Sequence, residues 1–283
     1  MEWSRALAQA QSNGFRSEEG SMLLLEKTAL FNHSCKPNAA AYFHQGRATA
    51  EVRALREIGQ GQEIALCYDS QLLLMPREER RKILHRRWGF VCECPRCMDP
   101  QDPTDQMLVA CNRHRKEGDS VGVGGATIQE ELAMKDAFQR AEQSFEEAAQ
   151  NRQLSSVRAA AESLHAALEL SQGKLQVTHW QVQLTLRNLA SCWFMILNDE
   201  QVNYERDVGV TEGELVMELR RVLRIAMAAE HATTHSLHPI RLSLFGMWDA
   251  LPASSEDWTV QGSFEDLERL RSVWEGQQDA SLG

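Results

Sequence analysis

The sequence has few of the features that mark membrane, secreted or nucleic-acid-binding proteins. No apolar run reaches the length of a bilayer span, and a long candidate, Leu186 to Leu197, is interrupted by polar groups. The first residues are polar and acidic and show no signal-peptide core. We therefore expect no membrane association and a location in the cytoplasm, the nucleus or both.

Basic charge is scarce in the second part of the chain. The net charge is −10, and residues 1–100 hold 14 Lys or Arg against 12 Asp or Glu, whereas the remainder holds 16 against 28. Nucleic-acid binding needs basic side chains against phosphates, so we expect no direct nucleic-acid contact. The acidic surplus would suit a basic peptide, but a solvated helical surface explains it more simply.

The 283 residues, 43% apolar and 25% charged, are typical of a soluble globular protein with one large domain or two ordinary ones. A helix is predicted from Pro76 to Trp88, because proline begins it and acidic residues precede basic ones. A loop is predicted over Asp99 to Asp105. Short strand-like runs precede them, at Ala39 to Phe43, Ala48 to Ala54 and Glu63 to Tyr68.

The character of the chain changes near Gln106. A linker over 106–127 contains the glycine-rich stretch Gly118 to Gly125. Beyond it, apolar residues recur at spacings of three and four, which predicts stacked helices like those of tetratricopeptide arrays. The predicted helices lie near 128–151, 154–172, 178–198, 212–231, 236–250 and 263–275.

Seven cysteines are present, and Cys92, Cys94 and Cys97 fall within six residues. An odd number with a tight cluster favours reduced thiols and metal binding over disulfides. Zinc takes four tetrahedral ligands, and a C-x-C-x-x-C loop can supply three of them. The alternative, three unligated thiols, would be open to oxidation. Spacing leaves the fourth ligand open among Cys35, Cys67, Cys111 and His85.

The segment from Asn32 to Asn38, N-H-S-C-K-P-N, is the most specific string in the chain. Its polar, turn-forming residues predict a loop whose Asn and His side chains could bind a polar ligand. Gly61 to Asp69 follows, ending in Cys-Tyr-Asp, and Trp88-Gly89-Phe90 and the cysteine cluster come next. The order of these features carries more information than any one of them.

This order resembles the second half of a SET domain followed by its post-SET zinc loop, and it is most similar to the SET and MYND-domain family of protein-lysine methyltransferases. The resemblance is close from Ala29 to Cys97, weaker at Ser12 to Phe15 and general over the helical tail. It implies an α+β fold: a partial, β-rich SET domain and post-SET zinc loop, then an all-α tetratricopeptide-like domain. The implied boundaries are 1–70 for the SET part, 71–105 for the post-SET helix and zinc loop, 106–127 for the linker and 128–283 for the helical domain.

The resemblance also implies residue roles. Asn32 and His33 would hold the methyl donor, S-adenosylmethionine, together with Asn13, and Phe90 would cover its adenine. Tyr68 matches the catalytic tyrosine. Methyl transfer from a sulfonium needs alignment and exclusion of water rather than a strong acid, so the lack of a Ser-His-Asp or paired-carboxylate constellation does not argue against an enzyme.

In the family, the cysteine of the N-H-S-C segment joins the post-SET cysteines, so Cys35 would complete one structural zinc site with Cys92, Cys94 and Cys97. The channel for the substrate lysine is assigned by the same resemblance. A tyrosine is usual in the family where Trp88 stands, so a tryptophan could narrow the channel and change the number of methyl groups added. The channel residues would be Gly14, Phe15, Ala29 and Trp88.

The family's Gly-x-Gly donor-binding strand and MYND zinc finger have no counterpart here, and residues 1–11 are too few to hold them. We therefore expect a fragment of a longer protein or a truncated product, with an incomplete donor site, weak donor binding and little turnover. The partner would be a histone or non-histone protein with a target lysine. The competing interpretation is a non-catalytic, zinc-stapled scaffold whose helical tail binds peptides.

Overall fold

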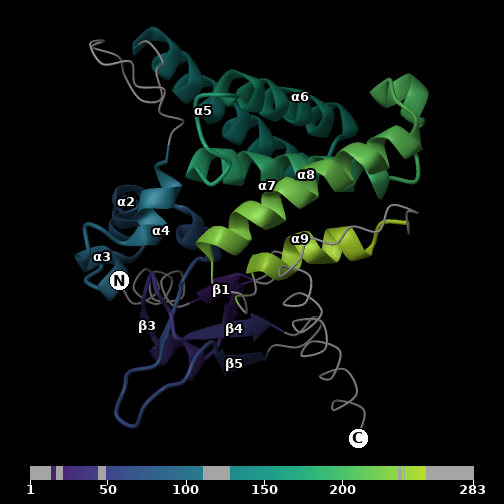
Figure 1. Ribbon diagram of the computed structural model, residues 1–283. Coiled ribbons are helices and arrows are strands. Elements are labelled where there is room, and N and C mark those ends of the chain that lie inside the picture. Colours follow the sequence, from purple (N-terminus) through teal and green to yellow (C-terminus); the bar gives the residue numbers. More distant parts are fainter. Residues whose placement is uncertain are drawn as a thin grey trace, which may run out of the picture. The chain divides into compact units, whose positions relative to one another are not determined.

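The computed structural model describes residues 14–16, 22–43, 49–110, 128–234, 238 and 240–252. The chain divides into two compact units (Figure 1). Unit 1 comprises residues 1–105 with 237–239, and unit 2 comprises residues 106–236 with 240–283. Short strands and small helices form unit 1, and long helices form unit 2.

Two antiparallel pairs of strands lie in unit 1. β1 (Gly14–Arg16) pairs with β2 (Met22–Leu24), and β4 (Ala39–Phe43) pairs with β5 (Ala50–Ala54). The strand predicted at Ala39 to Phe43 is confirmed, and the one predicted over 48–54 is found at β5. Ala39 and Ala40 at the start of β4 are both buried, and successive strand side chains point to opposite faces, so both faces of the strand are covered at this end.

A third, parallel pair joins β3 (Asn32–His33) to β6 (Ala65–Leu66). The strand predicted at Glu63 to Tyr68 is therefore shorter than expected. The Asn38 side chain occupies its first residues: Nδ2 donates to the Glu63 carbonyl at 2.8 Å, and Oδ1 accepts from the Ala65 N–H at 2.9 Å. A buried amide thus replaces part of a strand ladder.

The predicted helix after Pro76 is confirmed as α2 (Arg77–Trp88), with Pro76 as its N-cap. It ends at Gly89, whose φ of 75° is the left-handed conformation that glycine adopts readily at helix C-termini. Before it, η2 (Ser70–Leu74) is a 3-10 helix that buries three consecutive leucines. Leu84 of α2 is fully buried, so α2 and η2 contribute to the core of unit 1.

Two short helices follow, α3 (Pro95–Met98) and α4 (Pro103–Leu108). The loop predicted over Asp99 to Asp105 is therefore wrong in its last residues. The carboxylate of Asp102 accepts hydrogen bonds from the Thr104 N–H at 3.0 Å and the Asp105 N–H at 3.3 Å, and proline is favoured at the first helical position. This capping starts a helix inside the segment that was predicted to be a loop.

In unit 2, consecutive helices pack against one another, as in a stacked array. Four of the predicted helices agree with the structure within about two residues, and the fifth begins four residues later. The helix expected at 263–275 and most of the predicted linker lie outside the described residues. The helices are α5 (Ile128–Asn151), α6 (Leu154–Ser171), α7 (Trp180–Leu197), α8 (Glu212–Thr233) and α9 (Ile240–Asp249), with a π-helical turn, η4 (Tyr204–Val208).

The described residues form an α+β protein with more residues in helices than in strands. In unit 1 the strands are short, with two to five residues each, so this unit is less rich in strands than expected. Within this part of the chain, no helix combines the length and apolar character that a membrane crossing requires.

Candidate active site and metal centre

The Asn32–His33 pair is a strand, not the loop that its composition suggested. In the parallel pair, Asn32 lies opposite Ala65 and His33 opposite Leu66, and the Ser34 N–H donates to the Leu66 carbonyl at 2.8 Å. Polar residues accept extended backbone where a distant segment offers hydrogen bonds, which local composition does not reveal. This pairing brings the N-H-S-C segment beside Tyr68.

His33 links this strand to both Tyr68 and the first cysteine. Its Nδ1 accepts from the backbone N–H of Tyr68 at 3.2 Å, and its Nε2 lies 3.2 Å from Cys35 Sγ. With Nδ1 as acceptor, the neutral ring carries its proton on Nε2. Burial lowers the pKa of His33 to about 4, so the imidazole is neutral at physiological pH and donates toward sulfur.

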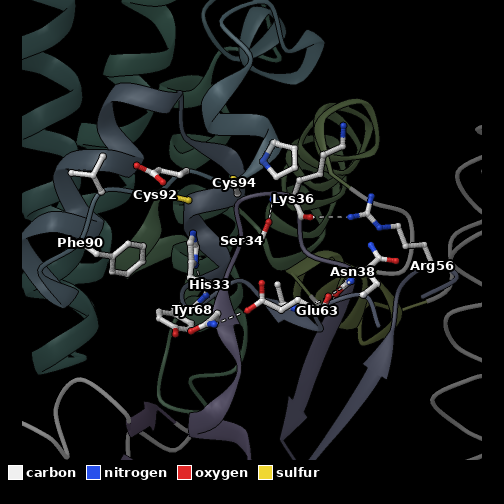
Figure 2. Close-up of a pocket in the computed structure, with 16 residues that line it drawn as sticks. His33, Ser34, Lys36, Asn38, Arg56, Glu63, Tyr68, Phe90, Cys92 and Cys94 are labelled. Carbon is white, nitrogen blue, oxygen red and sulfur yellow. Dashed lines mark hydrogen bonds between the residues drawn. The ribbon is translucent and has the colours of Figure 1, made fainter. Parts of the chain in front are cut away.

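Tyr68 lies close to three other aromatic rings, of which Figure 2 shows His33 and Phe90. Its ring centroid lies 5.2 Å from that of His33, 5.5 Å from Trp88 and 6.3 Å from Phe90, and the His33 and Tyr68 rings meet edge to face. The phenol donates to the Phe31 carbonyl at 3.0 Å. Burial, with Glu63 nearby, raises the pKa of Tyr68, so this hydroxyl stays protonated at neutral pH.

A cleft of about 690 Å³ opens beside this cluster, entirely within unit 1. Its lining includes Asn32, His33, Tyr68 and Phe90, and Cys92 to Pro95 form part of its wall. Asn32 Nδ2 donates to a carboxylate oxygen of Glu63 at 2.6 Å across the cleft lining. The volume lies within the usual range for small-molecule sites. Three segments distant in sequence therefore converge on one cavity.

Four cysteine sulfurs converge behind the cleft. Those of Cys35, Cys92, Cys94 and Cys97 all lie within 4.8 Å of one another, and three of these residues are buried. Zn–S bonds of about 2.3 Å in a tetrahedron place sulfurs about 3.8 Å apart. The separations of 3.9 Å from Cys35 to Cys92 and 3.6 Å from Cys35 to Cys97 fit that value and are too long for disulfides. The donor set therefore fits one tetrahedral zinc ion.

Two of the other candidates for the fourth ligand, Cys67 and His85, do not belong to this cluster of sulfurs. Cys67 Sγ donates to the Asp69 carbonyl at 3.1 Å, and His85 is exposed on α2. Cys111 lies outside the described residues. The cysteine that the family resemblance selected is thus the one that joins the trio.

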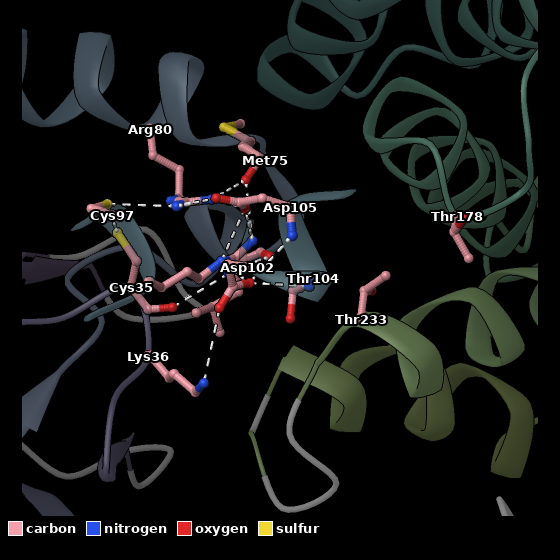
Figure 3. A network of polar contacts seen from close by, with 12 residues as sticks. Cys35, Lys36, Met75, Arg80, Cys97, Asp102, Thr104, Asp105, Thr178 and Thr233 are labelled. Carbon is pink, nitrogen blue, oxygen red and sulfur yellow. Dashed lines mark hydrogen bonds and ion pairs between the residues drawn. The ribbon is translucent and has the colours of Figure 1, made fainter. Parts of the chain in front are cut away.

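A set of arginines surrounds the cysteine loop, and sequence reasoning missed it. Arg80 and Arg96 are buried, and both bind Asp105, at 2.5 and 2.7 Å. Figure 3 shows the contact between Arg80 and Asp105. Arg80 also reaches Cys97 Sγ at 3.5 Å. In the sequence Arg80 of α2 and Arg96 of α3 look like the exposed arginines at the end of α2, so no local signal distinguishes them.

The structure gives less information on the remaining predicted site residues. Asn13 lies outside the described residues, and Gly14 and Phe15 belong to β1. Ala29 lies in η1 (Thr28–Leu30), a 3-10 helix, and is half-buried. Trp88 contacts Tyr68, and the Arg87 guanidinium lies 4.5 Å from its ring centroid. The channel assigned to these residues stays a prediction.

Residues 5–69 match the family model for the SET domain. The chain is 36% identical over 96 residues to the protein-lysine N-trimethyltransferase SMYD5 of Danio rerio, covering 34% of this chain and 23% of that protein. It is 39% identical over 94 residues to the histone-lysine N-methyltransferase SMYD3 of Mus musculus, covering 33% and 21%. With the N-lysine methyltransferase SMYD2-B of Danio rerio, identity is 32% over 144 residues, covering 49% and 29%.

The matched region thus spans less than a third of the length of these relatives. The family match includes the Asn13 to Phe15 segment, where the resemblance was weaker, and ends at the residue after Tyr68. Residues 5–69 are therefore similar to a SET domain, and the relatives that share this region are named protein-lysine or histone-lysine methyltransferases.

Proposed function

We propose that unit 1 binds S-adenosylmethionine and transfers its methyl group to a lysine of a protein, histone or non-histone. The observation that carries the proposal is the fixed phenol of Tyr68 within an aromatic cluster, beside a cleft walled by the cysteine loop. The names of the relatives, which are protein-lysine and histone-lysine methyltransferases, support the same reaction class.

The donor would supply a methyl group on a positively charged sulfur. Asn32, His33 and Phe90 line the same cleft and are the residues that we assign to holding it. Glu63 holds the Asn32 amide in place, and the backbone of Tyr68 fixes the His33 ring. Aromatic faces attract cations, so the cluster would favour a sulfonium and also a lysine side chain.

Tyr68 would orient the lysine amine rather than remove its proton. The raised pKa keeps its hydroxyl protonated, and the carbonyl of Phe31 fixes the direction of that hydroxyl. A free lysine has a pKa of about 10.4, and an apolar, aromatic surrounding disfavours the charged ammonium. Alignment of the amine with the donor would then be the main contribution to catalysis.

The first test is calorimetry of the zinc-loaded full chain with S-adenosylmethionine. Saturable binding at one site per chain supports the proposal, and no heat from correctly folded, zinc-loaded protein would remove it. The second test is Tyr68→Phe in a radiolabelled methyl-transfer assay with core histones and lysine peptide arrays. We expect transfer to fall by about a hundredfold or more, with donor affinity nearly unchanged.

The matched control for this substitution is Tyr42→Phe. Tyr42 belongs to β4 and lies outside the residues that line the cleft, but the chemical change is the same. Methyl transfer above background by the wild type, retained in full by the Tyr68→Phe variant, would refute the role of the phenol.

A second candidate function, binding of protein segments by the helices, rests on a cavity of about 540 Å³ in unit 2. Phe194, Met195 and Val157 supply apolar lining. Asp199 and Glu200 line the same cavity with Arg152, which leaves one net negative charge there. Such a lining suits a basic segment with an apolar anchor. Titration of a labelled Lys-rich peptide carrying one leucine tests it, and no binding by the wild type would remove it.

A further inference from the structure

Three guanidinium groups contact the segments that carry the cysteine ligands. Arg81 of α2 donates to the carbonyls of Cys92 and Cys97, at 3.5 and 3.2 Å, and Arg96 donates to the carbonyl of Cys35 at 3.3 Å. Arg80 differs from both, because its guanidinium lies 3.5 Å from a sulfur, that of Cys97.

Several bonds also fix the Arg80 guanidinium in place. Arg80 is 0% exposed, and its guanidinium forms a bidentate ion pair with Asp105, with N–O distances of 2.5 and 2.9 Å. The same group donates to the Met75 carbonyl at 2.7 Å. The planar guanidinium group is bound by both the Asp105 carboxylate and the Met75 carbonyl, which fixes its orientation. The N–H group that faces Cys97 therefore cannot turn away without breaking these bonds.

Charge explains why such a group is needed at this place. Four thiolates around one Zn²⁺ carry a formal charge of about −2. A buried charge is costly unless opposite charge and hydrogen bonds compensate it. Arg80 and Arg96 share Asp105. Asp102 pairs with both Arg96 and Lys36, so these five side chains together leave one positive charge next to the cysteine cluster.

We propose that Arg80 is a positioning residue for the metal: it donates to the Cys97 sulfur, holds that sulfur in its ligand position and offsets the negative charge of the cluster. Zinc then leaves slowly, and the cysteine loop keeps its place as a wall of the cleft. Cys92 and Cys94 contribute to that wall directly. The inference depends on the zinc site but not on methyl transfer, since it is measured on the metal.

The test compares zinc release from the full chain purified with its metal. A chromogenic chelator in excess reports the release rate for the wild type and for Arg80→Gln. We expect release about ten- to hundredfold faster from the variant, the range typical for groups that orient metal ligands. Arg80→Lys keeps the charge but loses the fork to Asp105, so its rate should fall between these two.

The matched control is Arg81→Gln, the same change at the next residue of the same helix. Because Arg81 contacts carbonyl oxygens of the loop, we expect zinc release from Arg81→Gln to stay within about threefold of the wild-type rate, below the tenfold effect expected of a group that orients ligands.

Substitution of cobalt for zinc adds a spectroscopic readout. The thiolate-to-cobalt absorption bands should shift in Arg80→Gln and stay unchanged in Arg81→Gln.

If Arg80→Gln does not fold, a second variant, Asp105→Asn, tests the same role. Asp105→Asn leaves Arg80 in place but weakens its anchor, so release should accelerate in the same direction by a smaller factor. Equal release rates for the Arg80 and Arg81 variants, or unchanged cobalt spectra with wild-type release, would overturn the role of Arg80. A folded wild-type chain that holds no zinc would overturn it as well.

Discussion

Replacing Cys35 with alanine removes the metal ligand that lies outside the cysteine loop. Cys35 follows β3, whereas the other three sulfurs lie between α2 and the end of α3. A zinc ion bound by all four therefore ties the segment that carries Asn32 and His33 to the loop that walls the cleft. The substitution cuts this tie while changing few packing contacts, because alanine retains the Cβ atom of the buried cysteine.

The size of the effect follows from the length of the loop that the metal closes. Cys35 and Cys92 are 57 residues apart in the chain. The chain-entropy relation for a crosslink of that length gives about 4 kcal/mol at 25 °C. Since each 1.4 kcal/mol is a factor of ten, this loss corresponds to a roughly thousandfold rise in the opening of unit 1.

Hydrogen exchange followed by mass spectrometry measures the two units separately. On the zinc-loaded full chain, peptides from β6 and α2 should lose about three orders of magnitude of protection in Cys35→Ala. Peptides from α6 and α7 should keep theirs, because these helices belong to unit 2. Adding a chelator should destabilise the wild type strongly and the variant much less.

Cys192→Ala provides the control, since Cys192 is buried in α7 and is not one of the four clustered cysteines. It should leave the zinc content and the protection of α2 unchanged. The reasoning fails if Cys35→Ala still binds one zinc per chain with wild-type affinity and shows wild-type exchange in unit 1.

Two further substitutions test local structure. Asn38→Ala removes the amide that bonds Glu63 and Ala65, so exchange in β6 should rise by an amount equivalent to about 1–3 kcal/mol; unchanged exchange would contradict the role of this amide. Thr211→Ala removes the capping box in which Thr211 and Glu214 bond each other's backbone N–H groups, so a urea melt should show α8 destabilised by about 1 kcal/mol. Thr211→Ser should restore most of that loss, and no rescue would argue against the cap.

Local patterns were enough to predict most of the helices and part of the metal site. The spacing of apolar residues placed four of the helices of unit 2 to within about two residues, and Pro76 with its following acidic residues placed the start of α2. Hydrophobic periodicity and helix-end preferences act over a few residues, so they can be read from the chain directly. The same holds for the three cysteines of the C-x-C-x-x-C loop, which lie within reach of one ion whatever the rest of the fold does.

Tertiary structure alone decided the features that join distant segments. It formed β3 from a segment that looked like a loop, because the backbone of Ala65 and Leu66 offered it a partner. It buried Arg80 and left other arginines of the same helix exposed, because Asp105 and the cysteine loop pack against one face only.

The fourth sulfur shows the division most directly. Spacing left four candidates for the ligand, and family resemblance favoured Cys35, but its approach to the loop depends on closing a chain segment of 57 residues. Closure over such a length is determined by the packing of the whole unit, since its entropic cost must be met by contacts far from either end. The sequence by itself therefore determined which local elements and which ligands are present, and the fold decided which of them meet.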